Sequence, residues 1–122
     1  MIIKDIENLI IDYLRSLKIY TWPVNSVGIF DPVRKIYRKP NKRFMPGVSD
    51  IHAFIEGRFV AIEVKQPKKY ATPEQNEFMN NVVKNGGIAF VARSIQDVDI
   101  ELAKYFDWLP AHKRGLKFVS RT

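Results

Sequence analysis

Apolar residues recur every three or four positions at the start of the chain and then give way to shorter, denser runs. Residues 2–18 place Ile2, Ile6, Leu9, Ile10, Tyr13, Leu14 and Leu17 on one stripe, which predicts an amphipathic helix. Residues 22–30 are expected to be extended, and Asp31-Pro32 to form a turn before a short basic extended piece at 35–38. A loop then runs from Pro40 to Gly47.

Two strands are predicted next, at 48–55 and 58–65, joined by a tight turn at Glu56-Gly57. After a basic loop at 66–71, a helix is expected over 72–85. Thr72 suits its N-cap, Pro73 its first turn and Gln75 a capping box, and Gly86-Gly87 end it. A short apolar strand at 88–92 follows, and Ser94 caps a last helix at about 95–106.

This order of a helix, three strands, a helix, a strand and a helix predicts an α/β fold with a mixed central sheet flanked by helices. The strand at 88–92 is expected to lie parallel to the strand at 58–65, through a right-handed crossover. A chain of 122 residues is long enough for one hydrophobic core. We therefore expect a single domain over residues 1–122.

Composition narrows the function classes. With 46% hydrophobic residues the chain is expected to fold, and no apolar run is long enough to span a membrane. The N-terminus has no basic segment before an apolar block, so no signal peptide is predicted and a cytoplasmic location is expected. Because cysteine is absent, a metal ion would need oxygen or histidine ligands.

The formal net charge of +7 favours a polyanionic partner, with nucleic acid as the first candidate, over a plain soluble basic protein. The basic residues form three groups: one at 34–43, a second of Lys65, Lys68 and Lys69, and a third of Lys113, Arg114, Lys117 and Arg121 near the C-terminus. The basic segment at 34–43 either binds the phosphate backbone of a nucleic acid or is a solvated loop. The predicted nucleic-acid contacts are Arg34, Lys35, Arg38, Lys39, Lys42, Arg43, Lys68 and Lys69.

The hairpin brings charged residues together. If Glu56 and Gly57 form the turn, Ile55 pairs with Arg58 and Asp50 lies opposite Glu63. Opposed side chains on one face have Cβ atoms about 4.5–5.5 Å apart, so the two carboxylates repel unless a cation lies between them. Hard oxygen ligands are what Mg²⁺ or Mn²⁺ prefers.

Lys65 projects from the same face as Glu63, and residue 64 presents a backbone carbonyl nearby. Two carboxylates and one ammonium suit phosphodiester hydrolysis, with the lysine steadying the attacking water or the developing charge. The alternative is a solvated face on which Lys65 pairs with a carboxylate. The apolar residues around the trio argue against it, since buried charges need a partner.

At these residues the sequence resembles the PD-(D/E)XK nuclease superfamily, through Gly47-Val48-Ser49-Asp50 and Glu63-Val64-Lys65. More closely, it resembles the virus-type replication-repair nuclease (VRR-NUC) domain. The similar stretches run from Met45 to Asp50 and from Gly57 to Lys65. They continue with Thr72-Pro73-Glu74-Gln75, Asn85-Gly86-Gly87 and Val91-Ala92-Arg93-Ser94, and together cover about half of the chain.

The resemblance implies that Asp50, Glu63 and the Val64 carbonyl bind Mg²⁺ or Mn²⁺ and that Lys65 is catalytic. It also implies a glutamate in the first helix, for which Glu7 is the candidate, although the family's glutamate often comes earlier, where this chain has Ile3. Ser49 replaces the superfamily's proline. The resemblance also places Gln75 close to the active centre, a role compatible with the capping box.

Four further features leave alternatives open. His52 shares a face with Asp50 and is either a ligand or, as we favour, a hydrogen-bonded strand residue. His112 is expected to contact solvent or phosphate. The aromatic residues Tyr20, Trp22 and Tyr37 could stack on bases, but aromatics in short strands are more often core. A dimer contact is hypothesised at Tyr105, Phe106, Trp108 and Leu109.

The resemblance implies a metal-dependent, structure-directed DNA endonuclease similar to Holliday-junction resolvases, acting as a homodimer in replication and repair. A two-fold dimer supplies the two matching cuts that a four-way junction needs. One alternative is a nucleic-acid-binding module that has kept the fold and lost catalysis. Another is a restriction-like or tRNA-processing enzyme, because a fold does not fix a substrate.

Overall fold

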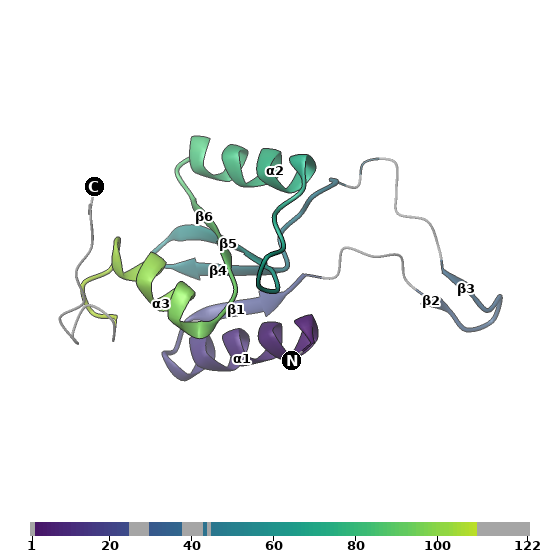
Figure 1. Ribbon diagram of the computed structural model, residues 1–122, viewed down its shortest axis with the longest axis horizontal. Helices are drawn as coiled ribbons and strands as arrows, with labels where there is room; N and C mark the ends of the chain where they lie inside the picture. The colour runs from purple at the N-terminus through teal and green to yellow at the C-terminus, as the bar shows by residue number, and fades with distance from the viewer. Residues whose placement is uncertain (1, 25–29, 38–42, 44, 110–122) are drawn as a thin grey trace.

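The predicted order of elements is confirmed in the computed structural model of the chain, which describes residues 2–24, 30–37, 43 and 45–109 (Figure 1). The elements that form the body of the protein are α1 (Ile3–Ser16), β1 (Tyr20–Pro23), β4 (Ile51–Ile55), β5 (Arg58–Val64), α2 (Pro73–Lys84), β6 (Ile88–Ala92) and α3 (Ile95–Ala103). Two short strands, β2 (Phe30–Asp31) and β3 (Ile36–Tyr37), form a separate hairpin to one side.

The four-stranded sheet has the order β1-β4-β5-β6. Strands β1, β4 and β5 are antiparallel, and β6 lies parallel to β5 as the crossover predicted. Ile55 pairs with Arg58, so the two-residue turn at Glu56-Gly57 is confirmed. Both turn residues have positive φ, at 50° and 82°, which matches the right-handed twist of the flanking strands.

Helices α1 and α3 cover one face of the sheet, and α2 covers the other (Figure 1). The face under α1 and α3 carries the hydrophobic core, because alternate strand residues point to opposite sides of a sheet. Its members come from both helices and from the strands, and they include Ile10, Leu14, Ile51, Val60, Ile62 and Leu102. The face under α2 is different in composition, and it carries the aromatic and charged side chains described below.

Several element boundaries differ from the prediction. Helix α1 ends at Ser16 rather than residue 18, since Lys18 adopts a left-handed φ of 66°. Strand β1 begins at Tyr20 rather than Trp22, and Asp31 lies in β2 rather than in the turn that follows it. Helix α3 ends at Ala103, three residues early.

The hypothesised dimer contact after α3 is wrong in two of its four residues. Phe106 and Leu109 are buried in the core, 4% and 1% exposed, because the chain folds back onto the face under α1 and α3. They are therefore not available to a partner.

Arg38, Lys39, Lys42, His112 and the C-terminal basic group lie outside the described residues. Within the described ranges, no helix combines the length and the apolar character needed to cross a bilayer.

Gly47 holds the loop before β4 against the start of α2. A Cβ at Gly47 would lie 2.3–2.7 Å from backbone atoms of Glu74 and Gln75, and its φ of 76° also disfavours a side chain. Contacts this short with backbone cannot be relieved by a rotamer change. Gly47 therefore sets the distance between α2 and the segment that leads into Asp50.

We predict that Gly47→Ala destabilises the protein more than Gly57→Ala does. Both glycines have positive φ, but a Cβ at Gly57 would meet no atom of the described residues within 4 Å. Gly57→Ala should therefore cost only the left-handed strain of about 1 kcal/mol, whereas Gly47→Ala should add about 1–3 kcal/mol of overpacking. Urea denaturation measures both changes, and equal losses would contradict the close approach.

Candidate metal and phosphodiester site

Asp50 lies at the mouth of the β4–β5 hairpin, one residue before β4 begins. Its Oδ2 accepts a hydrogen bond from the Val64 backbone N–H at 2.8 Å. Its backbone carbonyl accepts another from the Val24 N–H, also at 2.8 Å. The Asp50 carboxylate thus accepts a hydrogen bond that a backbone carbonyl of a neighbouring strand would otherwise accept. This bond fixes the Asp50 side chain next to Glu63.

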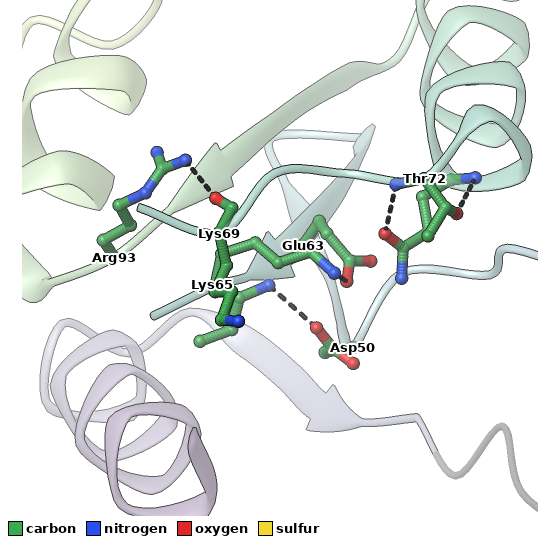
Figure 2. Close-up of polar contacts among 8 residues, drawn as sticks. Asp50, Glu63, Lys65, Lys69, Thr72 and Arg93 are labelled. Atoms are coloured by element: carbon green, nitrogen blue, oxygen red, sulfur yellow. Dashed lines mark hydrogen bonds and ion pairs between the residues drawn. The ribbon is translucent and has the colours of Figure 1, made fainter. Parts of the chain in front are cut away.

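Glu63 is buried beside this carboxylate, with its side chain only 2% exposed. Its Oε2 lies 3.5 Å from the Lys65 ammonium, whereas its Oε1 has no hydrogen-bond partner in the part of the chain that the structure describes. Figure 2 shows Asp50, Glu63 and Lys65 gathered at the carboxyl end of β5. The predicted grouping of two carboxylates and one ammonium is therefore present in the structure.

The surroundings of Glu63 disfavour its charged form. Burial, the neighbouring Asp50 charge and a hydrogen bond with Asp50 raise the pKa of Glu63 to about 8, and Lys65 opposes this shift. Without a metal ion, a proton on Glu63 offsets the repulsion between the two carboxylates, and Lys65 balances the charge of Asp50. A divalent cation at this site would take the place of that proton.

Glu7 on α1 faces the same site but is less closely tied to it. Burial and the charge of Asp50 raise its pKa, while Lys4, at 3.8 Å from Glu7 Oε1, lowers it. Across the described residues, no cluster of three acidic, histidine or cysteine side chains is close enough to hold a metal ion. A metal-binding or catalytic role for Glu7 therefore stays a prediction.

The donor atoms present fit a hard divalent cation. Glu63 Oε1 is buried and free of hydrogen bonds among the described residues, which is costly unless something else binds it. Asp50 uses its Oδ2 to accept the hydrogen bond from the Val64 N–H. Carboxylate oxygens are the ligands that Mg²⁺ and Mn²⁺ prefer. The Val64 carbonyl as a further ligand stays a prediction.

Gln75 forms the capping box that its sequence position predicts. Its backbone N–H donates to Thr72 Oγ1 at 3.2 Å, and its side-chain Oε1 accepts from the Thr72 N–H at 2.8 Å (Figure 2). Its amide oxygen is therefore engaged in starting α2, and a catalytic role for Gln75 stays a prediction.

The basic loop after β5 is anchored through Arg93, a residue with no predicted role. The Arg93 guanidinium donates to the Lys69 carbonyl at 2.6 Å (Figure 2). It also lies 5.6 Å from the centre of the Tyr70 ring. This contact holds the loop against the end of β6, so that Lys68 and Lys69 are exposed near Lys65. Neither the Arg93 anchor nor the close approach of Gly47 has a local signal in the sequence.

The other predicted phosphate contacts in the described ranges lie farther along the sequence from Asp50, Glu63 and Lys65. Arg34 and Lys35 are exposed in the turn of the β2–β3 hairpin, and Arg43 is exposed before β4. Their binding of nucleic acid stays a prediction.

One expectation about the aromatic face is wrong: Tyr20 is 74% exposed and so is not a core residue. His52 is a strand residue of β4, and its Nε2 is buried without a hydrogen-bond partner among the described residues. Burial lowers the pKa of His52, which favours its neutral form. The side chain of Tyr37 lies outside the described part of the structure.

The chain is similar in fold to a solved structure titled "VRR_NUC domain protein", with a TM-score of 0.60. The two sequences are 20% identical, and the match covers 80% of this chain and 82% of that one. The chain has a VRR-NUC-like fold. The resemblance inferred from the sequence is thus confirmed as a likeness of fold. The sequence itself matches no family profile and no curated protein.

We predict that the metal-free protein becomes less stable as the pH rises from about 5 to about 8.5. Folding raises the pKa of Glu63 from 4.5 to about 8, so the folded state retains a proton that the unfolded chain releases. The corresponding stability is complete below the unfolded pKa and is lost as the pH rises through the folded pKa. Thermal unfolding in EDTA measures the change.

Glu63→Gln should reduce this loss by ~3 °C or more in unfolding temperature, since the amide does not titrate. Glu77→Gln, at an exposed position on α2, is the matched control and should keep the full dependence. A Glu63→Gln profile that parallels the wild type would contradict the buried carboxylate pair.

Proposed function

We propose that this protein is a divalent-metal-dependent endonuclease that hydrolyses phosphodiester bonds in branched DNA. The observation that carries the proposal is the placement of the buried Glu63 next to Asp50 and Lys65. The Oε1 atom of Glu63 has no hydrogen-bond partner among the described residues. This arrangement stands on a fold of the nuclease type. Mg²⁺ or Mn²⁺ is the proposed cofactor.

Each residue of the site has a proposed role that follows from its contacts. Asp50 and Glu63 would hold the cation, with the Val64 carbonyl and Glu7 as further candidates. When bound, such a cation supplies charge neutralisation at the phosphoryl group and a lower pKa for a coordinated water. The Lys65 ammonium, partly shielded at 18% exposure, would stabilise the negative charge that develops on the phosphoryl oxygens.

DNA is proposed as the substrate because of charge. The net charge of +7 and the exposed Lys68 and Lys69 beside the site favour a polyanion. Arg34, Lys35 and Arg43 would extend the contact along the phosphate backbone. The same positive charge would also attract RNA, so the substrate assay includes both DNA and RNA.

A preference for four-way junctions requires two active sites related by two-fold symmetry, so a homodimer is part of the proposal. Sedimentation of the purified protein tests this part separately. A monomer at every concentration used for cleavage would contradict the resolvase-like dimer and leave the nuclease proposal standing.

One observation favours a second candidate, a nucleic-acid-binding module without catalysis. The described residues place only two carboxylates firmly at the site, and Glu7 is not joined to them in a three-ligand cluster. Cleavage and binding assays on the same variant distinguish the two candidates.

We predict that Lys65→Ala reduces cleavage at least ~100-fold, because a positioned charge at the reacting group is worth about that factor. The assay uses labelled junction, flap, single-stranded and duplex DNA, and a matched RNA, with Mg²⁺, Mn²⁺ or EDTA. Binding of DNA should change little, since the exposed lysines remain.

Lys84→Ala, which removes an exposed lysine at the end of α2, is the control and should cleave like the wild type. A thermal melt checks that Lys65→Ala is folded. Binding with no cleavage by the wild-type protein in any metal would favour the non-catalytic candidate, and equal cleavage by Lys65→Ala would refute the role of Lys65.

A further inference from the structure

Six aromatic rings form a continuous band on the sheet face that α2 covers only in part. Ring centroids are 5.3 Å apart for Tyr20 and Trp22, 6.0 Å for Trp22 and Phe54, and 5.6 Å for Phe54 and Phe59. His52 joins the band, 6.1 Å from Trp22 and 4.8 Å from Phe59, and Phe78 of α2 lies parallel to it at 6.0 Å. We call these six residues the aromatic band.

The band does not belong to the hydrophobic core. The core lies on the opposite face, under α1 and α3, and none of the six residues is part of it. Helix α2 packs over β5 and β6, and its Phe78 stacks on His52. The rings of Tyr20, Trp22 and Phe54 extend beyond the edge of the helix. Tyr20 is 74% and Phe54 45% exposed. Exposed aromatic side chains in a contiguous row favour a binding surface over a packing role.

A pocket opens at the end of the band that lies under α2. It has a volume of about 420 Å³ and is lined by His52, Phe59 and Phe78 together with Met45, Val82 and the amide-bearing Asn81 and Asn85. His52 contributes a buried Nε2 that has no hydrogen-bond partner among the described residues. Flat apolar walls with a few polar groups at the edge suit a nucleobase, which stacks by its faces and hydrogen-bonds by its edges.

The band lies next to the carboxylate site. His52 is two residues from Asp50, which is about 7 Å along a strand. It pairs with Ala61, which is two residues before Glu63 on the same face. A DNA strand with one phosphate at Asp50 and Glu63 would therefore place the neighbouring bases over these rings.

We propose that the aromatic band binds unpaired bases of the DNA strand next to the cleaved phosphate. This inference rests on the proposed nuclease function and names, among branched DNAs, those with unpaired bases at the cut, as at a flap or at the opened centre of a junction. Stacking needs no particular base, so the band would distinguish single-stranded from double-stranded DNA rather than one base sequence from another. The positive net charge of the chain supplies the attraction for the phosphates.

The test is equilibrium binding in EDTA, where the proposed cleavage cannot occur, to an oligothymidylate of ~12 nucleotides and to a duplex of equal length. Tyr20→Leu and Trp22→Leu keep an apolar side chain and remove the ring. Each should weaken oligothymidylate binding about tenfold and change duplex binding little. Ile100→Ala, which removes an exposed apolar side chain on α3 outside the band, is the control and should bind like the wild type.

A second readout follows the ring directly. The chain has two tryptophans, so in a Trp108→Phe background the fluorescence reports Trp22 alone. Oligothymidylate should quench it, and the duplex should not.

Equal binding by Tyr20→Leu, Trp22→Leu and wild type, or no binding of oligothymidylate by the wild type, would overturn the inference. So would a wild-type dimer that Trp22→Leu converts to a monomer with unchanged binding, because a second copy would then cover the band. Ring-dependent binding without cleavage in any metal would refute the nuclease proposal alone, and cleavage without ring-dependent binding would refute the band alone.

Discussion

Two carboxylates placed side by side, one of them removed from water, are the arrangement on which this account depends. Asp50 and Glu63 repel each other, and burial of Glu63 increases the cost of its charge. Lys65 offsets part of that cost. Natural folds keep such unfavourable groups mainly where a function needs them. A hard divalent cation is the partner that would satisfy both carboxylates and use the buried oxygen that lacks a hydrogen bond.

The rest of the fold holds this pair in place. The two-residue turn at Glu56-Gly57 sets the register of β4 and β5, and a slip by one residue would move Glu63 to the opposite face. Asp50 is fixed by the Val64 N–H. Behind it, Gly47 lets the loop touch the first turn of α2. The capping box at Thr72 and Gln75 in turn fixes where that helix begins.

Features with a local cause could be predicted from the sequence. The hairpin register follows from a glycine in a two-residue turn, and the start of α2 follows from Thr72, Pro73 and Gln75. The grouping of Asp50, Glu63 and Lys65 then follows from the alternation of strand side chains. The three-four spacing of apolar residues gave α1 to within two residues at its end.

Features that depend on tertiary contacts could not be predicted in the same way. Nothing near Gly47 in the sequence indicates that α2 packs against it, and nothing near Arg93 indicates its bond to Lys69. Whether an aromatic residue is buried or exposed also depends on which face of the sheet a helix covers. Phe106 is core because the chain folds back under the sheet, whereas Tyr20 is exposed because α2 does not reach β1.

The central claim is that Asp50 and Glu63 together bind a divalent cation. The most direct measurement is a crystal structure of the protein with Mn²⁺, using anomalous scattering to locate the ion. We expect a manganese peak between the Asp50 and Glu63 carboxylates that disappears in Glu63→Gln. A peak elsewhere on the protein, or none at this site in well-ordered crystals, would contradict this claim.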